Sequence, residues 1–467
     1  MKTQCINLLY LLLLASLCLL PAAWLPATTP EYDEQEVIER LQQIEDPILD
    51  LKYNHIVGAY IRGYLYRRGA RKAELVTGRA VLYFPIIEPL LAKHGLPEQL
   101  KYLPVVESAL KPHAVSPVGA SGLWQFMPGT AADYGLKIND YIDERRDPHK
   151  STEAAIHYLK RAYEKYGDWA LALAAYNGGS GRVSRAIKRG RSKNFWKIRR
   201  YMPRETRNYV PAYIAATYLM EYYKQYNIQP VYPDLELQIT ESILVYDAIS
   251  FYRIAQLTGL SLETIKTLNP AYKRDLLPND PQGNYLILPK RVMQAVKDYI
   301  KAKRPDHLAD IFFNDAPVKA LPEIPDQYHE TVYLVKAPAT VFEVAERLQV
   351  SVHQLAAWNQ LRADTLDAGL ELRVFYPKEI RRFKPMPPVA LFDPLPANHL
   401  PVQLFSQQAG SRPLPAIPLC YIIEDRQRLF EFSNQFPNIP VGKITELNQL
   451  EQREKLKPGD VVLLPRD

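Results

Sequence analysis

Residues 103–109 read LPVVESA and place one acidic residue in an apolar run. Glu107 lies four residues after Leu103 and three before Leu110. Residues at these spacings share one face of a helix, so the pattern predicts that the Glu107 carboxyl lies on a buried stripe. Burial disfavours the charged form and raises a carboxyl pKa toward the value that a general acid needs. The plainer interpretation is a glutamate paired with an arginine, or one turned to solvent past Pro104.

Three later segments combine glycine, aromatic and amide residues as the wall of a cleft would. They read GASGLWQFMP at 119–128, AAYNGG at 174–179 and NYVP at 208–211. Glycines permit tight loops, and aromatic and amide side chains suit contacts with a polar ligand. Each segment taken alone is equally well explained by core packing or by the end of a helix.

The sequence around these segments has a helical period. Apolar residues return every three or four positions over 31–85, which we interpret as a helical lead-in, and the pattern continues over 86–228. Asp147-Pro148 is typical of a helix start, and Gly167 is typical of a break between two helices. Because no strand-like alternation appears here, the sequence predicts a mainly α-helical body.

A different pattern, repeated three times, follows this body. Strand, helix, helix and strand are predicted in that order in three units, which span residues 240–290, 328–378 and 418–467. Corresponding asparagines stand 90 and 89 residues apart, at Asn269, Asn359 and Asn448. The pattern therefore predicts three copies of one small β-α-α-β module.

Two linkers are expected between these modules. Residues 291–327 contain a basic amphipathic helix over 291–302, and residues 379–417 are rich in proline and should be extended. We therefore expect three small modules tethered to one compact body, an arrangement that raises effective concentration at a polymeric surface.

The composition is that of a folded, water-soluble chain with several domains. The length of 467 residues predicts about three folded units. Contents of 47% hydrophobic and 23% charged residues exclude wholesale disorder and a polytopic membrane protein. A net charge of +7 does not require a nucleic-acid partner, and we predict none. Residues 182–207 are strongly basic and form either an anion-binding patch or a solvated helix face.

Residues 1–27 have the form of a secretory signal peptide or an N-terminal anchor. Lys2 precedes an apolar run at 8–20 that is too short to span a bilayer comfortably. Leu17 before Cys18 argues against a lipid anchor. We therefore expect export to the periplasm or cell envelope, with membrane association through the N-terminus if the leader is retained.

No cofactor and no metal site is predicted. The nine histidines lack ligand spacing, no cysteine pair is present, and the phosphate-loop and dinucleotide fingerprints are absent.

The four segments around Glu107, in their order and spacing, resemble the lytic transglycosylases of the SLT superfamily: Glu-Ser, Gly-Leu-x-Gln, Ala-Tyr-Asn and Tyr-Val-Pro. The repeated modules resemble LysM domains, although the Gly-Asp-Thr turn usual in that family is replaced in each copy. With its leader, the chain resembles the membrane-bound lytic murein transglycosylase D group. Trp124 stands where other members often have Met, and we expect it to alter one wall of the cleft.

The resemblance implies a mainly α-helical, lysozyme-like SLT domain followed by three LysM-like modules that bind the GlcNAc and MurNAc units of peptidoglycan strands. It implies that Glu107 first protonates the glycosidic oxygen and then accepts the proton of the muramoyl 6-hydroxyl, which yields a 1,6-anhydro product without water. It also implies a set of substrate-binding residues: Ser108, Gln125, Tyr176, Asn177 and Tyr209, the last holding the Glu107 carboxyl.

Plainer roles for these residues stay open from sequence. Ser108 could hydrogen-bond within its helix, Gln125 could stabilise its loop, and Asn177 could end a helix. The two tyrosines could belong to the core.

Two rival functions also stay open. A hydrolase of the lysozyme type would need a second carboxylate, for which the candidates are Glu88, Glu98, Asp133 and Asp143. A non-catalytic peptidoglycan-binding scaffold would need only the modules.

Overall fold

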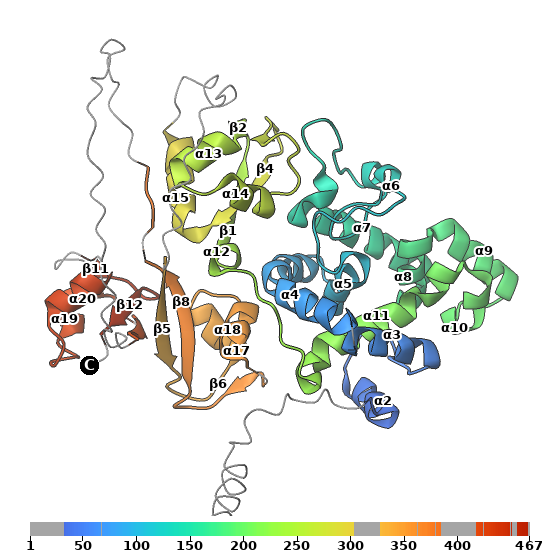
Figure 1. The fold of residues 1–467 in the computed structure, drawn as a ribbon, viewed down its shortest axis with the longest axis horizontal. Coiled ribbons are helices and arrows are strands. Elements are labelled where there is room, and N and C mark those ends of the chain that lie inside the picture. Colours follow the sequence, from blue (N-terminus) through green and yellow to red (C-terminus); the bar gives the residue numbers. More distant parts are fainter. Residues whose placement is uncertain are drawn as a thin grey trace, which may run out of the picture.

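The computed structural model describes residues 32–66, 68–302, 327–361, 363–378, 380–383, 417–423, 425–448, 450 and 455–465. The predicted leader at 1–27 lies outside these residues, as does most of the proline-rich linker. Figure 1 shows a helical body, coloured blue to green, beside the modules in yellow, orange and red.

The body is built from helices, as the sequence predicts. They are α2 (Glu34–Gln43), α3 (His55–Leu65), α4 (Arg68–Lys93), η2 (Glu98–Tyr102), α5 (Leu103–Ser108), α6 (Pro128–Asp133), η3 (Glu144–Arg146), α7 (Pro148–Tyr166), α8 (Trp169–Gly178), α9 (Ser180–Gly190), α10 (Phe195–Ile198), η4 (Arg199–Tyr201), α11 (Arg204–Tyr222) and η5 (Tyr223–Tyr226). Helix α8 is at the centre, because every residue from Ala170 to Ala175 is buried. A helix that is apolar on all sides must be covered on all sides, and α7 and α11 both pack against α8.

Helix α4 continues across residue 85, where the lead-in was expected to give way to the next region. Its stretch Gly69–Lys93 is long and apolar enough to cross a membrane by length and composition. However, Phe84, Ile87 and Leu91 on this stretch are buried in the core of the helical body. We therefore interpret α4 as a core helix that joins the lead-in to the rest of the body.

The predicted start and end of α7 are confirmed. The Asp147 carboxylate accepts hydrogen bonds from the backbone N–H groups of His149 and Lys150, and Pro148 occupies the first turn. The helix ends at Tyr166 and is followed by Gly167, which has a left-handed φ of 65°. These two caps fix the ends of the helix that forms one wall of the site.

Each module has the predicted order of elements. The first contains β1 (Thr240–Val245), β2 (Ile249–Ser250), α13 (Phe251–Thr258), α14 (Leu262–Leu268), β3 (Leu276–Leu277) and β4 (Asn284–Pro289). The second contains β5 (Tyr328–Leu334), β6 (Ala339–Thr340), α17 (Val341–Arg347), α18 (Val352–Asn359), β7 (Thr365–Leu366) and β8 (Glu371–Pro377). The third contains β9 (Leu419–Ile422), β10 (Gln427–Arg428), α19 (Leu429–Ser433), α20 (Val441–Asn448), β11 (Lys455–Leu456) and β12 (Val461–Leu464). In each module the first and last strands pair antiparallel.

The repeated asparagine has the same role in all three modules. In the first, the Asn269 amide donates to the carbonyls of Ile265 and Ile287 and accepts from the Ile287 N–H. Asn359 and Asn448 make the equivalent three bonds in the other modules. The asparagine therefore ties the end of the second helix to the last strand.

The helix expected at 291–302 forms as α15 (Lys290–Lys301), but it does not lie in a linker. Val292, Met293 and Val296 are buried in the core of the first module. Its apolar face needs a partner, and the module supplies one. The helix is therefore part of that module.

The modules pack closely, where extended tethers were expected. The second and third share one sheet in the order β12-β9-β5-β8, and β5 pairs parallel with β9. The first contacts the body through the Lys137–Asp280 ion pair and through the Asp143 N–H, which donates to the Ala271 carbonyl over 2.8 Å. The tethered arrangement is thus wrong for the described residues.

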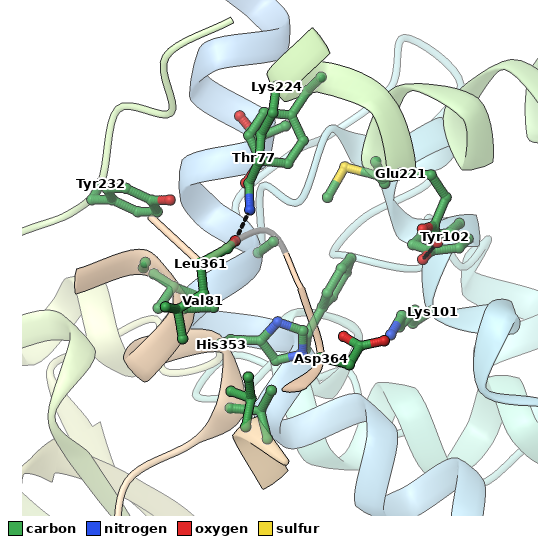
Figure 2. A pocket seen from close by; sticks show the side chains of 18 of the residues that line it. Thr77, Val81, Lys101, Tyr102, Glu221, Lys224, Tyr232, His353, Leu361 and Asp364 are labelled. Atoms are coloured by element: carbon green, nitrogen blue, oxygen red, sulfur yellow. Dashed lines mark hydrogen bonds between the residues drawn. The ribbon is translucent and has the colours of Figure 1, made fainter. Parts of the chain in front are cut away.

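The second module also contacts the body, around a cavity of about 400 Å³ (Figure 2). Here α18 lies against α4, and His353 is 2.7 Å from the Glu88 carboxylate. The Lys224 ammonium of the body also donates a hydrogen bond to the Leu361 carbonyl of this module (Figure 2). The Trp358 indole donates to the Gln238 side chain of the connecting helix α12 (Leu235–Gln238) over 3.0 Å.

Candidate active site

Glu107 is the penultimate residue of the short helix α5. The helix ends at Ser108 because Ala109 and Leu110 adopt left-handed φ values of 51° and 56°. Leu110 is fully buried but lies beyond the end of the helix. The prediction that Leu103, Glu107 and Leu110 share one face of a helix is therefore wrong for Leu110. Glu107 nevertheless lies at the edge of the core, half-buried, and faces a cavity.

This cavity has a volume of about 820 Å³ and is the meeting point of the four sequence segments. Glu107 comes from the end of α5, Gln125 from the loop before α6, and Asn177 from the end of α8. Tyr209 comes from the first half of α11. Residues far apart in the chain therefore converge on one carboxyl group.

The Glu107 carboxyl is held by Tyr209. The phenolic hydroxyl of Tyr209 donates a hydrogen bond to Oε1 of Glu107. Burial raises the pKa of Glu107 to about 7; the Tyr209 hydrogen bond opposes this rise and the charge of Glu205 adds to it. No salt bridge reaches Glu107 from any part of the chain that the structure describes. The interpretation of Glu107 as an arginine-paired glutamate is therefore not supported.

Tyr176 lines the same cavity and is anchored through the backbone. Its hydroxyl donates to the Trp124 carbonyl over 2.8 Å, and its ring meets that of Phe126 edge to face. Trp124 itself is fully buried, and its indole N–H donates to Thr152 Oγ1 over 2.8 Å. Trp124 is thus absent from the cavity wall, which corrects the expectation from sequence.

Gln125 and Ser108 are engaged with the protein backbone. Gln125 has a left-handed φ of 49°, and its Nε2 donates to the carbonyls of Ala114 and Gly122 over 3.1 and 2.8 Å. Ser108 is buried, and its Oγ lies within hydrogen-bonding distance of the Pro104 and Leu123 carbonyls. Gln125 faces the cavity, whereas Ser108 is not among the residues that line it. Ser108 therefore joins α5 to the loop that carries Gln125.

Asn177 lines the cavity beside a carboxylate that the sequence did not single out. Its Nδ2 is 3.4 Å from Oε1 of Glu205, in the first turn of α11. Glu205 is the single acidic residue in the basic stretch 182–207. This isolated negative charge is the feature of the sequence that could have identified Glu205 as a site residue. Arg182 from the same stretch also lines the cavity.

The lead-in also contributes to the cavity, which the sequence did not indicate. Tyr60 and Tyr64 of α3 line it, because α3 packs along α11. Phe126 and Met127, which directly precede α6, add apolar surface to the cavity wall. Aromatic faces beside polar groups suit a carbohydrate ligand.

None of the four carboxylates considered for a hydrolase lines this cavity. Glu88 and Glu98 both pair with Lys101, and Asp143 pairs with Arg145 over 2.8 Å. Asp133 is exposed at the end of α6. Among the described residues, Glu205 is the acidic side chain that shares the cavity with Glu107.

Family models match four regions of the chain. Residues 84–199 match the transglycosylase SLT domain, residues 239–304 match the LysM-like domain of lytic transglycosylase MltD, and residues 333–375 and 421–465 match the LysM domain.

The chain is also similar to individual proteins. Membrane-bound lytic murein transglycosylase D of Escherichia coli (strain K12) is 33% identical over 316 residues, which cover 66% of this chain and 67% of the relative. Soluble lytic murein transglycosylase of Salmonella typhimurium (strain LT2) is 42% identical over 83 residues, covering 16% of this chain and 13% of the relative. The crystal structure of the soluble lytic transglycosylase SLT70 from Escherichia coli matches at 28% identity with a TM-score of 0.27, covering 30% of this chain and 24% of that one.

Proposed function

The chain belongs to the membrane-bound lytic murein transglycosylase D family, and on that premise we propose that Glu107 is its catalytic acid and base. The protein is a lytic murein transglycosylase whose LysM modules bind peptidoglycan strands. The observation that carries the assignment of Glu107 is its place on the cavity wall, buried enough for a pKa of about 7 and held by Tyr209.

In the first step, Glu107 donates its proton to the oxygen that links MurNAc to GlcNAc. A pKa of about 7 leaves about half of the carboxyl groups protonated at neutral pH, whereas an ordinary glutamate would be almost fully ionised. Protonation makes the GlcNAc hydroxyl a good leaving group. The positive charge that develops at the anomeric carbon is then stabilised by the N-acetyl group of the substrate.

In the second step, the ionised Glu107 accepts the proton of the muramoyl 6-hydroxyl. That oxygen attacks the anomeric carbon and closes the 1,6-anhydro ring, so no water is consumed. One carboxyl group serves both steps because the nucleophile belongs to the sugar, in contrast to the two-carboxylate glycosidases. The Tyr209 hydroxyl keeps the carboxyl in position throughout.

The remaining cavity residues bind and orient the sugar. The Asn177 amide and the side-chain oxygen of Gln125 offer hydrogen bonds, and the Tyr176 ring forms part of the apolar wall. Ser108 does not line the cavity, but its hydrogen bond to the Leu123 carbonyl fixes the loop that carries Gln125. This assignment gives Ser108 a positioning role in place of the direct sugar contact implied by the family motif.

We place the protein in the cell envelope, where its substrate lies. The name of the Escherichia coli relative describes that protein as membrane-bound. Residues 1–27 of this chain would either direct export and be removed or be retained as an anchor.

Mass spectrometry of the products released from purified peptidoglycan sacculi tests the proposal. The wild-type protein should release anhydromuramoyl products, and Glu107→Gln should release none while still binding sacculi. Glu205→Gln is the matched control, because it removes the other carboxylate of the cavity and should leave the anhydro product unchanged in mass. Products released by Glu107→Gln would refute the role of Glu107. Products heavier by one water would identify a hydrolase.

A further inference from the structure

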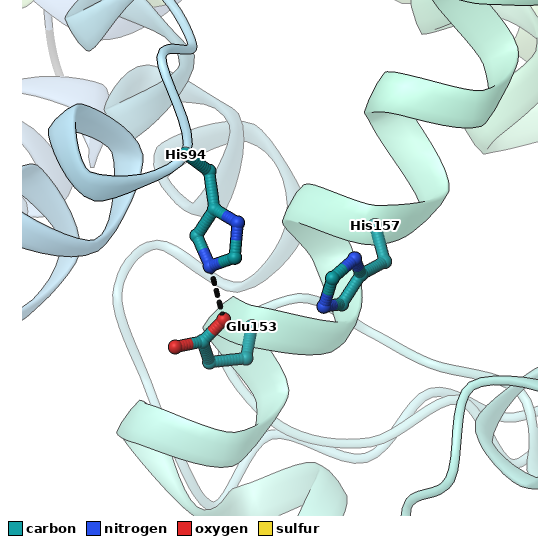
Figure 3. Close-up of side chains that lie close together, drawn as sticks. All are labelled: His94, Glu153 and His157. Atoms are coloured by element: carbon teal, nitrogen blue, oxygen red, sulfur yellow. Dashed lines mark hydrogen bonds and ion pairs between the residues drawn. The ribbon is translucent and has the colours of Figure 1, made fainter.

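Two histidines and a glutamate converge where the end of α4 meets α7 (Figure 3). Glu153 and His157 stand four residues apart on α7 and so share one face of that helix. His94, which directly follows α4, approaches from the other side, and its Nε2 is 2.6 Å from Oε2 of Glu153. The His94 and His157 rings meet edge to face, with centroids 5.2 Å apart.

The donor set is one that a divalent transition metal prefers. Two imidazoles and one carboxylate, with a further position open to water, form a common ligand set for Zn²⁺. The potential ligand atoms all lie within 4.8 Å of one another. Tetrahedral coordination at zinc–ligand distances of about 2.0–2.1 Å places ligand atoms about 3.4 Å apart. Small rotations of these three side chains would meet this requirement.

The charges around the cluster are compatible with a bound cation. The Lys93 ammonium pairs with Oε1 of Glu153 over 2.9 Å, but its side chain is 64% exposed and can turn into solvent. The other carboxylate oxygen faces His94. His157 is exposed and provides a path from solvent. His149, one turn earlier on α7, is already engaged, since its ring stacks on Tyr285 and its Nε2 is 3.0 Å from Ser242 Oγ.

We propose that His94, Glu153 and His157 bind one divalent transition-metal ion of the Zn²⁺ class. The ion replaces the hydrogen bond between His94 and Glu153 with metal bonds and clamps the end of α4 to α7. It takes no part in the cleavage reaction. Helix α7 carries Tyr158 on the cavity wall, so the clamp strengthens the scaffold behind the active site. Sequence spacing did not reveal the site because His94 lies 59 residues before Glu153.

Metal titration of the full-length protein, purified without a histidine tag, tests the site. Zn²⁺ is titrated by isothermal calorimetry, and Co²⁺ is titrated by its visible absorption, which reports tetrahedral coordination. We expect one equivalent of tightly bound metal in the wild type. His94→Ala and His157→Ala should each weaken binding more than about tenfold. His113→Ala is the matched control, because His113 is exposed and lies outside the cluster.

Absence of stoichiometric Zn²⁺ binding in the wild type would overturn the proposal. Equal affinity in the wild type and both cluster variants would also overturn it, since the metal would then bind elsewhere. If His94→Ala fails to fold, His157→Ala decides the question, because the exposed His157 can be replaced without opening the core. Glu153→Gln is a second test, because it keeps the side-chain volume and should weaken metal binding by removing the charge of the carboxylate ligand.

Discussion

The Tyr209 hydroxyl donates a hydrogen bond to the Glu107 carboxylate across 102 residues of sequence. It joins the end of α5 to α11 at the wall of the cavity, and it opposes the rise in pKa that burial imposes on Glu107. The same bond therefore positions the carboxyl that we propose to be catalytic and lowers its proton affinity. Removing the bond should separate these two effects. The loss of positioning should lower the maximal rate, whereas the change in the pKa of Glu107 should shift the pH dependence.

Replacing Tyr209 by Phe should lower the maximal rate by roughly 10- to 100-fold, because the carboxyl loses its positioning contact. The pKa of Glu107 should rise further, since the bond that lowers it is gone. In the proposed mechanism Glu107 acts first as an acid, so the decline of activity at high pH should move to higher pH. The measurement is the pH profile of product release. Tyr176→Phe should leave the position of this decline unchanged, because its hydroxyl bonds to the Trp124 backbone.

Replacing Glu107 by Gln should stabilise the helical body at high pH. The folded-state pKa of about 7 exceeds the ordinary value of 4.5, so the wild type loses stability as pH rises through this window. Above pH 7, the buried charge should cost the wild type about 3 kcal/mol relative to the variant. At pH 4.5 and below, the two proteins should be nearly equal. Urea unfolding at pH 4.5 and pH 8 checks this, and an equal difference at both pH values would contradict it.

Much of the architecture is encoded locally and was therefore predictable. The Asp147-Pro148 cap, the Gly167 break and the three repeated asparagines each act through neighbouring residues or through an internal repeat. The convergence of Glu107 with Tyr209 was predicted from the family motifs, and the hydrogen bond between them lies where that resemblance requires.

Other features depend on contacts between distant segments, which residue type alone does not specify. The left-handed residues Ala109 and Leu110 end α5 early, although neither is a glycine. Trp124 is buried because Thr152 on α7 accepts its indole hydrogen bond, a partner that its own loop does not reveal. Tyr60 joins the cavity because α3 packs along α11.

Replacing Asn269 by Ala should destabilise the first module by about 3 kcal/mol. Asn269 is 3% exposed, and its loss leaves the Ile287 N–H and carbonyl without their side-chain partner in a buried strand. Asn359→Ala should cost less, because the equivalent bonds to Arg373 are open to solvent. Hydrogen exchange of the β4 and β8 amides measures both effects in the full-length protein. Equal loss of protection in the two variants would show that the burial of the asparagine does not determine how much stability its replacement removes.

Replacing Glu88 by Gln should loosen the second module from the body. Oε1 of Glu88 lies 2.6 Å from the Lys101 ammonium and 2.7 Å from Nε2 of His353 on α18. Burial alone would raise the pKa of Glu88, but His353 and Lys101 outweigh it and hold the pKa below its ordinary value. The contribution to docking is therefore present at neutral pH and is lost as pH falls through that lowered pKa.

The substitution leaves Lys101, which is 8% exposed, with Glu98 as its remaining carboxylate partner among the described residues. We expect docking to weaken by about 2 kcal/mol, less than for a fully buried pair because Glu88 is 23% exposed. Small-angle X-ray scattering should then report a larger radius of gyration. Glu98→Gln is the control, because Glu98 pairs with the same lysine but is 61% exposed and makes no bond to His353. An unchanged radius in Glu88→Gln would mean that the contacts of Trp358 and Gln354 with Gln238 suffice to hold the module.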